Sequence, residues 1–281
     1  MKKITEKLIS QTIASLCIKA NLNLSSDALS ALQKAARSET FERARTILNQ
    51  LIENAKIASA QRVPICQDTG LPVVFVEIGK DADIAGLDIS KAIDRGIETG
   101  YRDGYLRNSI VREPLRRGAS KFSPSVIHYD LVSGRGIKFT VLPKGFGSEN
   151  KTKLLMFDPT ASLDEIKDFI VASVKDAGPD ACPPYIVGVG IGGTADYACV
   201  LAKKSLLKPI GSVNYRPSSD VHRLQKVLFN EINKLNIGPM GLGGDTTCLG
   251  VNILTHPTHI AGLPVCVNIS CHVLRSASAT I

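Results

Sequence analysis

The chain has 281 residues, of which 44% are hydrophobic, and a formal net charge of +8 at pH 7. This length and composition allow a buried core, and no apolar run reaches the roughly 18 to 20 residues of a membrane helix. The first residues lack the apolar stretch of a secretion signal, so we expect a globular cytoplasmic protein without membrane contact. Lys and Arg are dispersed and Trp is absent, which argues against a nucleic-acid partner and leaves small anions as the better match for the positive charge.

The first sixty residues have the periodicity of helices. Apolar residues recur at three-to-four spacing over 6–19, and polar side chains near Ser25 and Asp27 are typical of the start of a second helix. A third helix is expected over 41–60. We therefore predict an α/β protein in which a helical N-terminal segment, residues 1–62, packs on a mixed α/β body, residues 63–281. One continuous domain is the alternative.

Strand and helix patterns alternate in the body. Ser162 and Glu165 have the spacing of a reciprocal capping box, which predicts that a helix begins there. Two strand-like runs are separated by a short Ser-Gly-Arg-Gly segment, so we expect them to form a hairpin. The expected strands are 71–79, the hairpin 125–132 and 136–143, 185–193, 251–256 and 263–270, and the expected helices are 165–177, 194–207 and 218–235.

Seven cysteines are spread over the chain, an odd number that does not suit a disulfide scaffold. No C-x-x-C pair occurs, so neither the usual zinc arrangement nor a ferredoxin-type carrier is supported. Cys66, Cys182 and Cys271 fall at expected strand ends or turns, whereas Cys17 and Cys199 fall on expected helices. Taken singly, each thiol is best read as a small buried hydrophobe.

Three converging thiolates would hold an iron–sulfur cluster and leave one iron without a protein ligand. An open iron can act as a Lewis acid on a hydroxy acid, which is the architecture of a dehydratase. The gaps between these cysteines are 116 and 89 residues (182 − 66 and 271 − 182), so only tertiary folding could assemble such a site.

A glycine pattern at 188–193 matches G-x-G-x-x-G between an expected strand and helix, as in dinucleotide sites. The acidic residue expected about twenty positions later is missing, because the sequence near Ser212 is GSVNYR. We interpret the glycines as allowing close packing of the strand on the helix behind Cys182.

Six segments carry a resemblance to a known family: PICQDTG (64–70), LRNS (106–109), KGFGSENKT (144–152), ACPPYIVGVGIGGT (181–194), GPMGLGGDTT (238–247) and HIAGLPVCVNISC (259–271). Over nearly its whole length the chain resembles the α subunit, or N-terminal domain, of class I fumarases and L-tartrate dehydratases. The resemblance implies that Cys66, Cys182 and Cys271 ligate a 4Fe-4S cluster. Cys266 is the alternative for the third ligand.

The resemblance also implies roles for residues near these cysteines. Gln67 and Asp68 would line the substrate site, and Arg107 would bind a substrate carboxylate by a bidentate contact. His259 would work with Asp68 on the proton of the departing hydroxyl, although His256 lies near enough in sequence to be confused with it. The backbone of Gly147 would approach substrate. Two departures from the family pattern are Phe146 within the Gly145–Gly147 loop and His272 after the third cysteine.

The function expected from this resemblance is the reversible dehydration of (S)-malate to fumarate, a step of the tricarboxylic acid cycle. Family members carry the remaining basic residues and the C3 base in a β subunit or C-terminal domain, and we expect a separate β subunit in an α2β2-type assembly. L-tartrate dehydratase is the alternative, and the GSENKT form of the loop favours the fumarase. The alternative from another class is a cluster-binding sensor without activity. A sensor needs the cysteines but no residues that bind a dicarboxylate, so it is disfavoured by the presence of Arg107, Asp68 and His259.

Overall fold

The computed structural model describes residues 3–115, 118–212, 216 and 219–281, and it confirms an α/β fold with a helical N-terminal segment. The helices are α1 (Glu6–Leu22), α2 (Ser26–Ser38), α3 (Glu42–Gln61), α4 (Ile89–Asp103), α5 (Phe146–Glu149), α6 (Leu163–Ala177), α7 (Ala195–Ser205), α8 (Asp220–Asn233) and the 3-10 helix Pro239–Gly241. The strands are β1 (Leu71–Gly79), β2 (Ile110–Val111), β3 (Ser120–Lys121), β4 (Val126–Val132), β5 (Ile137–Lys144), β6 (Lys153–Phe157), β7 (Tyr185–Ile191), β8 (Cys248–Thr255), β9 (Leu263–Ser270) and β10 (Ala277–Thr280).

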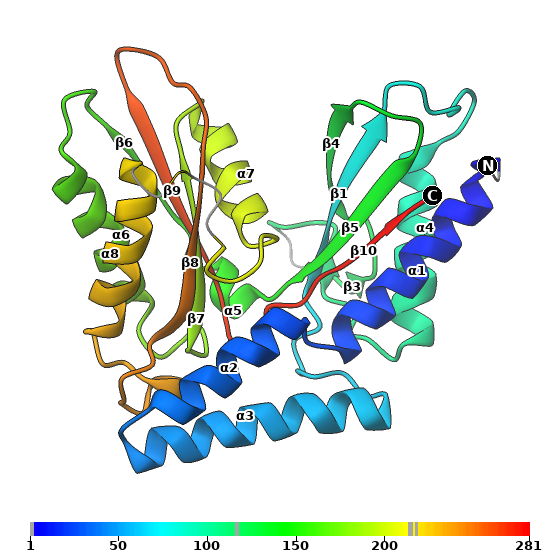
Figure 1. Cartoon of the computed structure of the whole chain (residues 1–281). Coiled ribbons are helices and arrows are strands. Elements are labelled where there is room, and N and C mark those ends of the chain that lie inside the picture. The colour runs from blue at the N-terminus through cyan, green and yellow to red at the C-terminus, as the bar shows by residue number, and fades with distance from the viewer. Residues whose placement is uncertain (1–2, 116–117, 213–215, 217–218) are drawn as a thin grey trace. The chain divides into compact units, whose positions relative to one another are not determined.

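Two compact units divide these elements (Figure 1). Unit 1 contains Met1–Leu24, Lys56–Phe146 and Arg275–Ile281, and unit 2 contains Ser25–Ala55 and Gly147–Leu274. Each unit thus draws on separate stretches of the chain, and α1 and α2 fall into different units. This grouping by contacts differs from the expected boundary after residue 62, and the domain assignment itself stays a prediction.

Unit 1 is a four-stranded sheet covered by α1 and α4 (Figure 1). The strand order is β10-β5-β1-β4, and the core between the sheet and the helices includes Ile13, Ile97 and Phe139, all fully buried. β1 is apolar on both faces, so a central position in the sheet removes most of its surface from water. The apolar periodicity of residues 6–19 is explained by this core, because the buried positions of α1 point into it.

The hairpin expected from 125–143 is wrong, because β4 and β5 lie on opposite sides of β1. β1 pairs in parallel with β4 and antiparallel with β5. The segment between them crosses the end of β1 instead of closing a turn: Gly79 donates to the Gly136 carbonyl at 2.9 Å, and Asp81 donates to that of Gly134 at 3.0 Å. Gly79 permits this crossing, since a Cβ there would lie 2.4 Å from the Gly134 oxygen.

Unit 2 is a second four-stranded sheet with helices on both faces (Figure 1). Its order is β6-β9-β7-β8, with β7 and β8 parallel and β9 antiparallel to both of its neighbours. α6 and α8 cover one face over a core that includes Val187, Leu228 and Val267. α7 covers the other face, where Ala198 and Ala202 pack on Cys266.

The glycine pattern of β7 serves this packing. A Cβ on Gly188 would lie 2.3 Å from the Ala202 carbonyl oxygen, and one on Gly190 would lie 2.1 Å from that of Ala198. Both distances are impossible for real side chains, so α7 can lie this close to β7 only if these positions are glycine. The structural interpretation of the pattern is confirmed.

Helix starts follow the local signals in most cases. Ser162 and Glu165 form the predicted capping box, with Glu165 N–H donating to the Ser162 hydroxyl at 3.2 Å. α2 begins at Ser26 as expected, but the Ser25 side chain makes no capping bond, and Asp27 instead accepts from the Ile210 N–H at 2.9 Å. The start predicted at 218 lies outside the described residues. None of the helices in the described part of the chain is long and apolar enough to span a membrane.

Candidate functional site

The loop between α3 and β1 carries Cys66, Gln67 and Asp68, and unit 1 fixes it through its carbonyl groups. The buried Tyr101 hydroxyl of α4 lies 3.0 Å from the Thr69 carbonyl oxygen and 3.1 Å from that of Gly70. An Arg275 Nη2 donates to the Asp68 carbonyl. These hydrogen bonds fix the backbone of the loop, while the Cys66 side chain is half-buried and the Gln67 side chain is exposed.

The Asp68 carboxylate is also held in place. Its Oδ1 accepts from the Gly70 N–H at 3.0 Å, and its Oδ2 accepts from the Phe146 N–H at 2.9 Å. A Cβ on Gly145 would lie 3.2 Å from the same Oδ2, tighter than an ordinary contact. Gly145 thus makes room for Asp68, which assigns this glycine to the chain's own packing.

Arg107 joins the same loop through its backbone. Its N–H donates to the Thr69 hydroxyl at 2.9 Å, while its side chain is exposed. No ion pair in the described part of the chain involves Arg107. Unit 1 therefore brings Cys66, Gln67, Asp68 and the Arg107 backbone to one place, as expected for neighbours in a site.

In unit 2 the loops of Cys182 and Cys271 are tied together. His272, next to Cys271, donates its backbone N–H to the Cys182 carbonyl at 3.4 Å, and its ring Nδ1 lies 3.1 Å from the same oxygen. Cys182 has a φ of +56°, a conformation that a non-glycine residue rarely adopts and that often marks a functional site. His272 thus links two of the three expected ligand loops.

The KGFGSENKT segment is anchored to β9 and α7 through Glu149. Its Oε1 lies 2.5 Å from Lys203 Nζ, and its Oε2 accepts from Asn268 Nδ2 at 3.0 Å. Asn268 also donates to the Thr152 hydroxyl at 2.8 Å. A Cβ on Gly147 would meet only the Asp180 carbonyl oxygen, at an ordinary 3.7 Å. The described packing does not require a glycine at 147, and the expected backbone contact of Gly147 with substrate stays a prediction.

His259 lies in the exposed turn between β8 and β9, where its Nδ1 accepts from the Ala261 N–H at 3.2 Å. His256 is tied down instead: its ring packs edge-on against Tyr197 with centroids 4.8 Å apart, and its Nδ1 lies 2.9 Å from the Pro257 carbonyl oxygen. A bound ring is the expected behaviour of a structural histidine. His259 belongs to unit 2 and Asp68 to unit 1, so their pairing stays a prediction.

The remaining thiols are suited to packing. Burial raises the pKa of Cys17 to about 12 and also raises the pKa of Cys248 and of Cys266. Cys266 is 0% exposed and faces α7, beside Cys199. Since metals bind the thiolate, a thiol kept neutral by burial is a poor ligand. This supports Cys271 over Cys266 as the third ligand.

The donor set fits a cluster held by three thiolates, since Cys66, Cys182 and Cys271 are partly exposed and lie outside the helices and strands. Among the described residues, no three or more His, Cys, Asp and Glu side chains gather as a metal site. The three cysteines come from both units, which are described separately, so their convergence stays a prediction.

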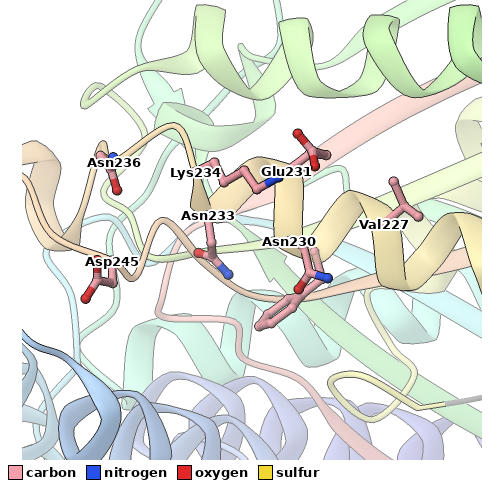
Figure 2. Close-up of a pocket in the computed structure, with 8 residues that line it drawn as sticks. Val227, Asn230, Glu231, Asn233, Lys234, Asn236 and Asp245 are labelled. Atoms are coloured by element: carbon pink, nitrogen blue, oxygen red, sulfur yellow. Dashed lines mark hydrogen bonds and ion pairs between the residues drawn. The ribbon is translucent and has the colours of Figure 1, made fainter.

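The pockets found in unit 2 are lined by residues other than the predicted site residues. One pocket along α8 has a volume of about 740 Å³ and is lined by Val227, Phe229, Asn230, Glu231, Asn233, Lys234, Asn236 and Asp245. Figure 2 shows how the labelled residues lie. A second, of about 880 Å³, is lined by residues of α2, α8 and β8. Asn233 at the first pocket is committed to the fold, because its Oδ1 accepts from the N–H groups of Thr247 and Cys248. None of the predicted site residues lines either pocket.

Sequence reasoning missed the residues that support the loops. Tyr101, Arg275, Glu149 and Asn268 contact site segments from 31 to 207 residues away in sequence. Tyr101 and Arg275 carry no local signal that marks them as supports of a site loop. Glu149 lies in a segment that the resemblance singled out, so it could have been flagged there.

Comparison with known proteins shows the family of the chain. A provisionally named L(+)-tartrate dehydratase subunit alpha from Methanocaldococcus jannaschii is 40% identical over 275 residues, covering 96% of each chain. L(+)-tartrate dehydratase subunits alpha of Escherichia coli strains UTI89 and K12 are 26% and 25% identical over 279 residues, covering 97% of this chain and 90% of theirs. The family model described as fumarate hydratase (Fumerase) matches residues 10–280, and the chain belongs to this family.

Proposed function

We propose that the chain is the α subunit of a two-subunit class I hydro-lyase that interconverts (S)-malate and fumarate. The family match over residues 10–280 is the observation that carries this proposal. The fixed Cys66–Gly70 loop supports it, because Asp68 and the adjacent ligand candidate are presented in a defined geometry. The relatives named as subunits alpha support a separate β subunit, and an α2β2-type assembly is the form we expect.

A 4Fe-4S cluster bound by Cys66, Cys182 and Cys271 would supply a Lewis acid that polarises the hydroxyl to be eliminated. Arg107 is exposed and offers a planar fork of donors, which suits a carboxylate of the substrate. Gln67 lies beside it on the same loop and would donate to the substrate. These groups orient a dicarboxylate but do not themselves move protons.

Proton transfer is assigned to Asp68 and His259. Asp68 is held by two backbone N–H groups, so its carboxylate is fixed rather than free to rotate. His259 is exposed, and its imidazole is a ring that can donate or accept a hydrogen bond through either nitrogen. We assign to this pair the proton that leaves with the hydroxyl, and to Gly147 a backbone contact with substrate.

L-tartrate dehydration is the second candidate. The 40% identity with the M. jannaschii protein favours it, whereas the family description favours fumarate. Both substrates are hydroxy dicarboxylates that lose water, so the described residues serve either. Tartrate carries a second hydroxyl that malate lacks, so the choice of substrate depends on which protein group lies beside that hydroxyl.

Co-expression with the candidate β chain and anaerobic reconstitution with iron and sulfide test the proposal. Turnover of (S)-malate, L-tartrate and mesaconate is then compared, with the α chain alone as a control that should be inactive. Activity with tartrate alone would replace the fumarase assignment and keep the hydro-lyase. Absence of activity with all three substrates despite bound iron would contradict the enzyme and favour a cluster-binding sensor.

Ligand assignment has its own test. Cys66→Ser, Cys182→Ser and Cys271→Ser should each lose the brown chromophore and the iron, because an alcohol replaces a soft ligand. Cys17→Ser and Cys199→Ser are the controls and should keep both. Iron and sulfide per chain are measured after anaerobic reconstitution. Iron retained in all three ligand variants would overturn the assignment.

A further inference from the structure

The guanidinium of Arg275 is a buried cation that contacts the Cys66–Gly70 loop. The residue is 3% exposed and lies two positions before β10 in unit 1. Its Nη2 donates to the Asp68 carbonyl, but its Nε and Nη1 are buried with no hydrogen-bond partner among the described residues. A guanidinium does not lose its proton in proteins. Two donor groups and one full positive charge are therefore unused in this structure.

No carboxylate of the described chain forms an ion pair with this charge. Arg275 takes part in none of the ion pairs found among residues 3–115, 118–212, 216 and 219–281. The Asp68 carboxylate accepts from the N–H groups of Gly70 and Phe146 and is in no ion pair with Arg275 among the described residues. Tyr101 stays neutral, since burial raises its pKa well above the usual value.

An unpaired buried cation is costly to a folded protein, so its retention calls for an anion in the working state. The loop that Arg275 contacts is the place where one is expected. Its bonded carbonyl belongs to Asp68, two residues after Cys66, the ligand candidate. A bound cluster brings thiolate and sulfide charge to this loop, and a dicarboxylate adds more.

We propose that Arg275 is a positioning residue that holds the Cys66–Gly70 loop and whose charge is balanced only when that loop carries its anionic group. This inference rests on the proposed function, which supplies the anion. Arg275 acts through the loop and the field it creates there, without touching the reacting atoms.

Arg275→Met separates this role from a purely structural one. A structural clamp stabilises the chain whether or not the cluster is present. An unpaired buried cation instead destabilises the metal-free chain, and it stabilises the chain that has bound the anionic cluster. The full chain with Met at 275 should therefore unfold at the same or a higher urea concentration than wild type when metal-free. After reconstitution it should lose iron at least tenfold faster to a chelator.

Two variants serve as controls. Tyr101→Phe removes the hydroxyl bonds to the same loop without changing charge, so it should lower the urea midpoint in both states. Arg275→Lys keeps the charge and loses the fork, and it should lie between wild type and Arg275→Met in the rate of iron loss. The cluster's reduction potential gives a second readout: it should fall in Arg275→Met and stay near wild type in Arg275→Lys and Tyr101→Phe.

Addition of (S)-malate distinguishes the two sources of negative charge. If the dicarboxylate supplies the balancing anion, malate slows iron loss from wild type and not from Arg275→Met. If the cluster alone supplies the balancing anion, malate does not change the difference in the rate of iron loss between wild type and Arg275→Met. The proposal is overturned if Arg275→Met lowers the metal-free urea midpoint as Tyr101→Phe does, with an unchanged rate of iron loss. Failure of wild type to take up iron would instead contradict the proposed function, and the metal-free comparison would still decide the role of Arg275.

Discussion

Individual thiols of this chain occupy very different surroundings. Cys17 is enclosed by the core of unit 1, and Cys248 and Cys266 by unit 2, whereas Cys66 is half-buried in a loop. Burial disfavours the charged form of a thiol, so the enclosed cysteines stay neutral and inert. Burial thus sets Cys17, Cys248 and Cys266 apart from the ligand candidates, whereas Cys199 is half-buried and differs from them by lying on α7.

Alkaline stability should report the burial of Cys17. Burial raises its pKa from 9.0 to about 12, so between these pH values the unfolded chain has lost a proton that the folded chain keeps. The contribution is complete below pH 9 and declines as pH rises towards 12, by about 1 kcal/mol between pH 9 and 10. Urea unfolding of the metal-free chain at pH 8 and pH 10 measures it. Cys17→Ala should show a smaller decline, and an equal decline in both chains would refute the assignment.

Secondary-structure elements are placed by close backbone contacts at glycines as much as by apolar side chains. α7 lies on β7 at Gly188 and Gly190, and the segment after β4 crosses β1 at Gly79. Neither arrangement tolerates a side chain, since the missing Cβ position is occupied by a carbonyl oxygen. Local patterns do predict helix starts, as at Ser162, because capping involves residues that are only three positions apart.

Gly190→Ala tests the packing of α7. The added methyl would lie 2.1 Å from the Ala198 oxygen and 2.6 Å from the Ala202 nitrogen, so the helix must shift. We expect a loss of about 1–3 kcal/mol in the free energy of unfolding, as for other overpacked sites. Gly118→Ala is the matched control, because no atom of the described residues lies within 4 Å of its Cβ position. Equal urea midpoints for the two variants would show that α7 does not lie where described.

At the scale of the whole molecule, two sheets carry two separate hydrophobic cores. The chain enters unit 2 at Ser25, returns at Lys56, leaves again at Gly147 and comes back at Arg275. Each core therefore depends on contacts between segments far apart in sequence. Loss of one core should open its own unit first, since local openings follow cooperative packing.

Hydrogen exchange can detect this independence. Ile97→Ala removes a fully buried side chain from unit 1 and should cost about 2–5 kcal/mol. Exchange should accelerate in β1, β5 and α1 more than in β7, β8 and β9. Ile253→Ala, in the core of unit 2, is the reciprocal variant and should show the opposite pattern. Uniform acceleration throughout the chain in both variants would mean that the units unfold as one.

The sequence by itself predicted most of the helices, though not α4 or the short α5, most of the strands and the identity of the site candidates. Helical periodicity, caps and motif segments such as PICQDTG act over a few residues, so they can be read locally. Only the tertiary structure decided that β1 lies between β4 and β5, and that Arg275 reaches Asp68 across 207 residues. Strand order and buried polar contacts depend on which distant segments exclude water together, and no short window of sequence contains that information.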